Sequence, residues 1–264
     1  MGLYANNIHL LRTLIINSVT AAVGLGLLAN RRRNPEIVPT PSTDLAECPT
    51  VAIIVPARNE EANIAPLLAT LLGQDYPEDR YSIILVDDGS TDRTRQIAQH
   101  MASHHPNLRL VQAGSLPGGW TGKNNAMFAG YRAAPVDASW LLFVDADTRH
   151  RPMMLSSIVG EAQTSGAGLL SLVIDVEMGT FWERLLVPQI GEVYTLLVGT
   201  MDSVNRRKGG GAAANGQCML IRREIYSEVG ALDSVRSDVA EDRAIAAACK
   251  ERGYTVRLAY GRKL

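Results

Sequence analysis

The chain lacks a charge excess of either sign and has few cysteines, and both absences exclude classes of protein. Its 264 residues include 26 Lys and Arg against 27 Asp and Glu, for a net charge of -1. Nucleic-acid binding is not expected, because it depends on a basic surface. The spacing of Cys48, Cys218 and Cys249 suits neither a metal site nor a disulfide framework. We expect reduced thiols in a cytosolic environment.

Two glycine-rich phosphate-binding signatures are also absent. No G-x-G-x-x-G follows the first predicted strand, which argues against a dinucleotide-binding Rossmann domain. No G-x-x-x-x-G-K-[ST] occurs, so the sequence contains no P-loop motif. The length and the 46% hydrophobic content nevertheless suit one large α/β domain or two small ones.

An uncharged stretch near the N-terminus, residues 13–29, is followed closely by three arginines at 31–33. With the apolar residues 8–11 it approaches the roughly 20 residues that span a bilayer. Charge after the apolar run suits a retained anchor whose C-terminal side is cytosolic, rather than a cleaved signal peptide. We predict a single-pass membrane anchor helix with a basic flank over 1–33. The alternative is a buried or interfacial helix, because polar residues at 17, 18 and 20 weaken the run.

The remainder of the chain is predicted to form a linker and then a domain in which strands alternate with helices. Residues 34–49 are predicted as a linker, since their prolines and small polar residues disfavour helix and strand. In the domain predicted over 50–264, apolar runs indicate strands at 51–57, 81–88, 108–113, 140–147, 168–176 and 218–223. Helical spacing occurs at 61–74, 91–105, 122–134 and 151–166. This alternation predicts an α/β fold with a mainly parallel sheet flanked by helices.

Polar clusters follow three of the predicted strands. They are PARNEE at 56–61, DDGSTD at 87–92 and DADTRH at 145–150. Open α/β sheets bind ligands outside the carboxyl ends of their strands, where these clusters would meet. One acidic strand end also suits a turn or a helix cap, but three at one sheet edge indicate a binding site.

Asp145 and Asp147 form a D-x-D at the end of one predicted strand. In extended backbone, residues two apart point to the same side, so both carboxylates would offer oxygen ligands to Mg²⁺ or Mn²⁺. Magnesium usually takes one or two carboxylates and completes its shell with water and substrate phosphates. The structural alternative is that Asp147 or Thr148 caps the following helix.

Glu241 and Asp242 also have two interpretations. Ser237 or Asp238 is expected to cap the following helix, which places the pair in its first turn, where the helix dipole favours negative charge. Alternatively, one carboxylate faces the cleft as a general base. The spacing alone does not choose between these interpretations.

The motifs occur in the order seen in family 2 glycosyltransferases, which the chain resembles from about Thr50 to Leu264. The segments that carry the resemblance are VAIIVPARNEEANIAPLLATLLGQDYP, IILVDDGSTDRT, LPGGWTGKNNAMFAGYRAA, WLLFVDADT, GQCMLIRREIYSEVGAL and VAEDRAIAAACKERGY. The resemblance implies a GT-A fold and inverting, nucleotide-sugar-dependent transfer. PGGWTGK and the N-terminal stretch look most like the bacterial membrane branch that includes hopanoid- and carotenoid-associated enzymes.

The resemblance implies a role for each matching position. The positions that would bind the nucleotide sugar are Pro56, Arg58, Asn59, Glu60, Asp87, Asp88, Lys123 and Asp145. Asp145 and Asp147 match the metal-binding pair, with Asp147 the direct ligand of Mg²⁺ or Mn²⁺. Glu241 and Asp242 match a catalytic pair whose aspartate is the base. Each has a structural alternative: Asn59 and the Asp87–Asp88 pair as turn residues, and Lys123 as a solvated charge at a helix start.

The expected activity is inverting transfer of a sugar, with a UDP-sugar as the expected donor, to a hydroxyl acceptor on a lipid. It would take place at the cytoplasmic face of the bacterial inner membrane. One alternative is a nucleotidyltransferase, which would more often have a glycine-rich, basic loop where this chain has PARNEE. The other is a non-catalytic, membrane-bound nucleotide-sugar-binding module. It is suggested because relatives continue beyond the position of Leu264 with an aromatic and basic motif and further membrane helices.

The sequence also predicts the character of two further segments, residues 179–201 and 206–216. Residues 179–201 are rich in apolar residues, and Pro188 should kink any helix there. They are expected either as a core helix pair or as an interfacial segment that lies on the membrane and guides a lipid acceptor. The glycine-rich residues 206–216 suggest a mobile loop over the donor.

Overall fold

The computed structural model describes residues 35–187, 200–206, 210–229, 236–237 and 240–264. The anchor predicted at 1–33 lies outside these ranges. Within them, we find no helix whose length and apolar character would let it cross a bilayer.

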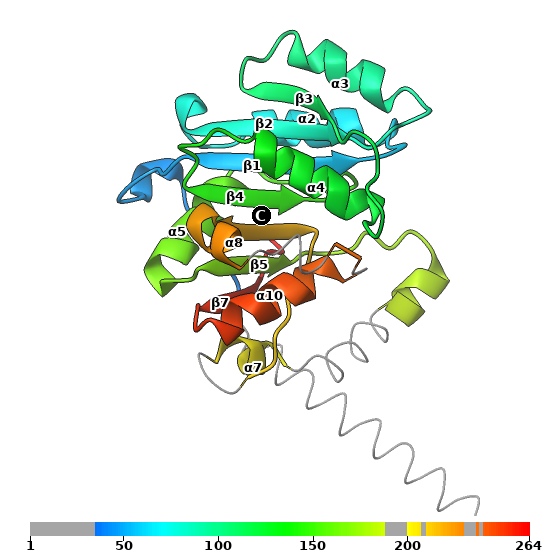
Figure 1. The fold of residues 1–264 in the computed structure, drawn as a ribbon. Helices are drawn as coiled ribbons and strands as arrows, with labels where there is room; N and C mark the ends of the chain where they lie inside the picture. Colours follow the sequence, from blue (N-terminus) through cyan, green and yellow to red (C-terminus); the bar gives the residue numbers. More distant parts are fainter. Residues whose placement is uncertain (1–34, 188–199, 207–209, 230–235, 238–239) are drawn as a thin grey trace, which may run out of the picture.

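A seven-stranded sheet forms the centre of the described domain (Figure 1). Its order is β3 (Leu108–Gln112), β2 (Tyr81–Asp87), β1 (Val51–Ala57), β4 (Trp140–Val144), β6 (Cys218–Arg222), β5 (Leu169–Val173) and β7 (Val256–Tyr260). The neighbours from β3 to β4 are parallel, and β7 is parallel to β5. Among the described strands, only β6 runs against its neighbours. The predicted mainly parallel α/β architecture is therefore confirmed.

Helices cover both faces of the sheet because the central strands are apolar on both sides. Alternate residues of β1 belong to different cores, with Ile53 on one face and Ile54 on the other. The first face packs against α2 (Ile64–Leu72), α3 (Thr94–Ala102) and α5 (Met154–Ser165). The second packs against α4 (Gly122–Ala133), α8 (Arg223–Glu228) and α10 (Glu241–Glu251), which are seen in front of the sheet in Figure 1. The short helix α7 (Met201–Asn205) lies beside β7.

Helix α4 packs closely against the sheet at Gly130. A Cβ atom at Gly130 would come within 2.4 Å of Cγ2 of Ile54 and 3.1 Å of Cγ2 of Val86. Glycine at this position therefore lets the helix rest directly on β1 and β2. That close packing fixes the N-terminus of α4, which carries Lys123, beside the ends of the two strands.

The expected linker is tied to the domain. The Ile37 amide donates to the Tyr260 carbonyl at 3.0 Å, and the Tyr260 amide donates to the Pro35 carbonyl at 2.9 Å. Farther along, Ser42 bonds to Asp75 through its hydroxyl at 2.8 Å. The segment forms only a short 3-10 helix (Ser42–Asp44), in line with its proline content. Residues 35–49 thus run along the domain as an ordered strap.

Several predicted element ends change in the structure. β4 ends at Val144, so Asp145 and Asp147 lie in a turn rather than in extended backbone. The argument that an extended strand places them on one side was therefore wrong. The turn is closed by Thr148, whose amide and hydroxyl both donate to the Asp145 carbonyl. β7 was not predicted, because an arginine interrupts its short apolar run, VRLAY.

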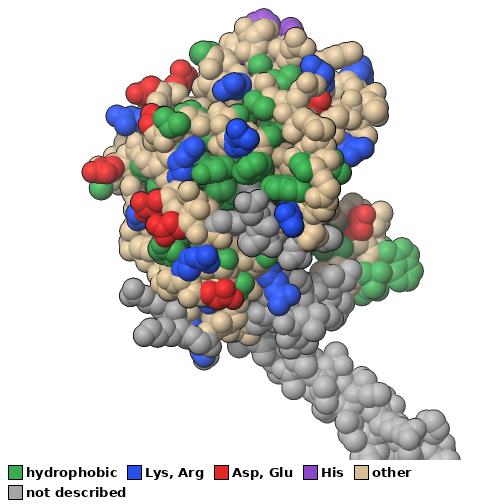
Figure 2. Space-filling view, in the orientation of Figure 1, with side chains coloured by type: hydrophobic (Ala, Val, Ile, Leu, Met, Phe, Trp, Pro, Cys, Tyr) green, Lys and Arg blue, Asp and Glu red, His purple; other side chains and the backbone are tan. Residues whose placement is uncertain are grey.

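The apolar segment at 179–201 is described only up to residue 187. A helix occupies 181–187, and its hydrophobic side chains project from the right edge of the molecule (Figure 2). Phe181 is 71% exposed and Trp182 is 65% exposed. The core-helix expectation is therefore wrong for this part. Residues 188–199, including Pro188, and residues 207–209 of the expected glycine-rich loop lie outside the described ranges.

Candidate active site

A cleft of about 480 Å³ opens at the carboxyl ends of β1, β2 and β4. The residues that line it are Pro56, Ala57, Arg58, Glu60, Asp88, Gly122, Lys123, Ala126, Asp145, Ala146 and Asp147. The three polar strand ends noted in the sequence therefore meet at one sheet edge, together with the first turn of α4. Seven of these residues were predicted to belong to the site: Pro56, Arg58, Glu60, Asp88, Lys123, Asp145 and Asp147.

Asn59 is near the cleft but does not line it. Its backbone adopts φ +56°, a left-handed conformation that asparagine tolerates better than most residues. Its side-chain oxygen accepts from the Thr91 amide at 2.8 Å, which joins the loop after β1 to the loop after β2. The Glu60 amide donates to the Thr94 hydroxyl at 2.7 Å and adds a second tie. Asn59 thus has a structural task in shaping the cleft wall.

The two aspartates after β2 separate in the structure. Asp87 is buried, and its Oδ1 accepts from the Ser90 amide at 3.1 Å, a side-chain to backbone bond that closes the turn after β2. Asp88 lines the cleft, with its Oδ2 3.7 Å from Nη1 of Arg58. The turn made by the first aspartate therefore leaves the second to face a ligand.

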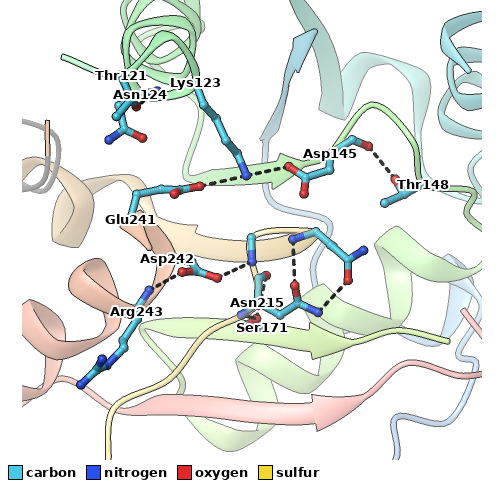
Figure 3. Close-up of polar contacts among 12 residues, drawn as sticks. Thr121, Lys123, Asn124, Asp145, Thr148, Ser171, Asn215, Glu241, Asp242 and Arg243 are labelled. Carbon is cyan, nitrogen blue, oxygen red and sulfur yellow. Dashed lines mark hydrogen bonds and ion pairs between the residues drawn. The ribbon is translucent and has the colours of Figure 1, made fainter. Parts of the chain in front are cut away.

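Lys123 lies between two carboxylates at the centre of the site (Figure 3). Thr121 caps α4 by accepting from the Asn124 amide, which places Lys123 in the first turn of the helix. Its Nζ is 2.9 Å from Oδ1 of Asp145 and 2.9 Å from Oε1 of Glu241. A cation at a helix N-terminus is disfavoured by the helix dipole, so these carboxylates hold it there. Burial acts to lower the pKa of Lys123, but Asp145 and Glu241 outweigh it and raise that pKa.

Glu241 and Asp242 begin helix α10, and their side chains have different surroundings. Glu241 is buried, with 4% of its surface exposed, and pairs with Lys123. Asp242 is partly exposed, and its Oδ2 accepts from the Gly216 amide at 2.8 Å. The helix cap is Ala240, which has no capping side chain, so the expected cap at Ser237 is wrong; residue 238 lies outside the described ranges.

Gly216 shows how close these groups lie to one another. A Cβ atom there would be 3.3 Å from Nζ of Lys123, 3.5 Å from Oε1 of Glu241 and 3.6 Å from Oδ2 of Asp242. Asp242 therefore sits beside the Lys123–Glu241 pair, although it does not line the cleft itself. Gly216 was expected only as part of a loop over the donor, and Gly122, where a Cβ would come within 2.4 Å of the Asp88 carboxylate, was not singled out. Gly122 lies in the GWTGK segment, and that motif could have indicated the position of this glycine in the site.

The carboxylates of Asp145 and Asp147 suit a hard divalent cation. Both line the cleft, and Asp147 is exposed to solvent. Within the described ranges, no group of three or more His, Cys, Asp or Glu side chains is arranged to hold a metal ion. Two carboxylates with the rest of the shell open nevertheless match the way proteins hold Mg²⁺ with substrate phosphates.

A sheet that gathers carboxylates and a lysine at its parallel strand ends is built like a GT-A-type sugar transferase. The chain belongs to glycosyl transferase family 2, whose family model matches residues 52–230. This membership leaves the nucleotidyltransferase alternative without support.

Curated relatives share part of their length with this chain. It is 31% identical over 176 residues to a beta-monoglucosyldiacylglycerol synthase of Synechocystis sp., covering 64% of this chain and 36% of that protein. It is 34% identical over 125 residues to a 4,4'-diaponeurosporenoate glycosyltransferase of Staphylococcus aureus, covering 47% and 31%. A probable glycosyltransferase, YdaM of Bacillus subtilis, is 27% identical over 83% of this chain and 51% of its own. The chain thus spans about a third to a half of these relatives.

Solved structures share the fold. A mannosyltransferase of Pyrobaculum calidifontis, in complex with GDP-Man and Mn²⁺, superposes with a TM-score of 0.62 at 23% identity, over 92% of this chain and 66% of that one. TarS of S. aureus in complex with UDP-GlcNAc gives 0.56 at 19% identity, over 81% and 59%. Both likenesses support the GT-A-like architecture.

Proposed function

We propose that this protein transfers a sugar from a nucleotide diphosphate sugar to a hydroxyl group of a lipid, with inversion at the anomeric carbon. The observation that carries the proposal is the chain of charges across the cleft, from Asp145 through Lys123 to Glu241, with Asp242 beside it. These side chains bring oxygen ligands, a cation and a candidate base together in one site.

The wall formed by the loops after β1 and β2 is the proposed nucleotide side. Pro56, Arg58, Glu60 and Asp88 line it, while Asn59 and Asp87 hold the two loops in shape. Structural neighbours were solved with GDP-Man and with UDP-GlcNAc, which supports a nucleotide-sugar donor. We take a UDP-sugar as the first donor to test.

Asp147 and Asp145 would hold Mg²⁺ or Mn²⁺, and such an ion, when bound, would stabilise negative charge on the diphosphate leaving group. Lys123 contributes a fixed positive charge on the same side of the cleft. Asp242 accepts the proton of the acceptor hydroxyl as general base. The oxygen then bonds to the anomeric carbon while the bond from that carbon to the diphosphate breaks, and the diphosphate leaves with the electron pair. Attack opposite the leaving group inverts the configuration.

A lipid acceptor is supported by two observations. The names of two relatives point to lipid products or substrates, a diacylglycerol derivative and a carotenoid acid. The helix at 181–187 exposes Phe181, Trp182, Leu185 and Leu186, a set of large apolar side chains that suits a membrane interface. We propose that the domain works at the cytoplasmic face of the bacterial inner membrane and that residues 1–33 anchor it there.

The direct test is nucleoside diphosphate release from a panel of UDP- and GDP-sugars by the full chain, in detergent with a lipid extract and Mn²⁺. Asp242→Asn is expected to lower sugar transfer about 10²- to 10⁴-fold, the range for removal of a general base. It should leave the Kd for UDP in the presence of Mn²⁺ unchanged. Asp202→Asn, the same change at an exposed position of α7, is the control. Turnover at the wild-type rate in Asp242→Asn would remove the assignment of the base.

A further inference from the structure

The ion pairs of Lys123 place a cation on a carboxylate that is also a proposed metal ligand. Oδ1 of Asp145 lies 2.9 Å from Nζ of Lys123, well within direct contact. A divalent cation bound by Asp145 and Asp147 would therefore lie within a few ångströms of the ammonium group. At such distances the repulsion between like charges is substantial even in a partly solvated site.

Glu241 keeps Lys123 in the site whether or not Asp145 is available. Its side chain is only 5% exposed and lies 2.9 Å from the ammonium, whereas the Asp145 side chain is 26% exposed. A buried carboxylate without a counter-charge is strongly destabilising, so the Lys123–Glu241 contact is the more permanent of the two. The ion pair between Lys123 and Asp145 is therefore the one that a ligand can break.

A diphosphate changes this balance because it brings negative charge for both cations. In its absence, a metal ion must displace Lys123 from Asp145 against charge repulsion. In its presence, Lys123 can pair with a phosphate oxygen while it stays bound to Glu241. The side chain is 40% exposed and lines the cleft, so a phosphate group can reach it.

We propose that Lys123, through its ion pair with Asp145, makes metal binding depend on the donor diphosphate. The buried carboxylate of Glu241 keeps the ammonium of Lys123 in the site. The inference rests on the proposed metal-dependent transfer but concerns a separate property, the order and coupling of binding. Because coupling between two ligands is reciprocal, the metal ion and the nucleotide raise each other's affinity by the same factor. Lys123 sets the size of that factor by weakening the binding of the metal ion alone.

The experiment measures Mn²⁺ affinity by calorimetry on the full chain in detergent, with and without UDP. Lys123→Met is expected to raise the Mn²⁺ affinity measured without UDP by at least about tenfold. The gain in Mn²⁺ affinity that UDP produces should shrink by a similar factor. Lys263→Met, which removes the same charge at an exposed position, should behave as the wild type.

A second variant guards against misfolding of the first, since Lys123→Met leaves Glu241 without its partner. The double variant Lys123→Met/Glu241→Gln removes both charges of the buried pair and should show the same rise in Mn²⁺ affinity. Unchanged Mn²⁺ affinity without UDP in both variants, while the wild type binds Mn²⁺ with UDP, overturns this inference and leaves the proposed function standing. Failure of the wild type to bind Mn²⁺ even with UDP overturns the metal-dependent function and this inference with it.

Discussion

The two sides of the cleft are built differently. On the side of β1 and β2, hydrogen bonds between neighbouring loops fix the wall, through Asn59 with Thr91 and Glu60 with Thr94. On the side of α10, the carboxylate of Glu241 is joined by the ammonium of Lys123 on α4 to Asp145, which follows β4. The first side is held by hydrogen bonds from backbone amides, and the second is held by ion pairs between side chains.

This difference indicates which side is preformed. Hydrogen bonds between loops set a fixed shape for a nucleotide, and such a wall needs little rearrangement when a donor binds. Ion pairs between side chains respond to new charge in the cleft, because a ligand phosphate or a metal ion competes for the same groups. The α10 side can therefore respond to the ligand while the β1–β2 side stays in place.

The largest effect on stability is expected from acidification, which acts on a histidine behind the turn that follows β4. His150 is buried behind the D-x-D turn, its Nε2 is 2.9 Å from the Thr148 hydroxyl, and its backbone amide donates to Thr70 of α2. Burial, with a smaller effect from Arg149, lowers the pKa of His150 to about 4 from an ordinary 6.5. The unfolded chain therefore binds more protons than the folded chain between these values. The contribution to stability is present above pH 6.5 and is lost as pH falls towards 4.

The expected loss is about 2–3 kcal/mol of the free energy of unfolding between pH 7 and 4. Urea unfolding at both pH values measures it in the wild type and in His150→Gln, which should lose this part of the pH dependence. His105→Gln, at an exposed histidine, is the matched control. Equal pH dependence in His150→Gln and the wild type would show that folding does not lower the pKa of this histidine.

A smaller effect is expected when the tie between the two loops is cut. Asn59→Ala removes the acceptor for the Thr91 amide and places a less tolerant residue at φ +56°. The free energy of unfolding should fall by about 1–2 kcal/mol, and UDP should bind more weakly because the wall loses its shape. Asn59→Gly separates the two causes, since it removes the hydrogen bond without backbone strain. If Asn59→Gly and Asn59→Ala bind UDP as tightly as the wild type, the wall does not depend on this bond.

The smallest effect on stability is expected at the exposed helix outside both sides. Phe181→Ser/Trp182→Ser should change the free energy of unfolding by less than about 0.5 kcal/mol, because both side chains lie on the surface. Binding of residues 35–264 to vesicles of phosphatidylglycerol and phosphatidylethanolamine, measured by sedimentation without the proposed anchor, should nevertheless decrease. Val136→Ser, at another exposed apolar side chain, is the control. Equal vesicle binding by all three proteins would argue against a membrane role for this helix.

The sequence predicted the sheet edge better than the contacts across it. Apolar runs located six of the seven described strands, and their polar ends located the cleft. Whether Asp87 or Asp88 faces the cleft depended on the hydrogen bond from the Ser90 amide to Asp87, which a pair of adjacent aspartates does not reveal. The contact between Lys123 and Glu241 joins residues 118 positions apart, and only the packing of α4 and α10 on one face of the sheet brings them together. β7 was missed because its pattern is short and interrupted by charge.

The strap at residues 35–49 limits how far the domain can move from the part of the chain that precedes it. A free chain of about 15 residues could extend roughly 50 Å and would let the domain move widely around any attachment point before it. Pairing of Pro35 and Ile37 with Tyr260 removes that slack, because the chain is already fastened at the β7 edge of the sheet. The chain therefore has no free length between residue 35 and the β7 edge of the sheet.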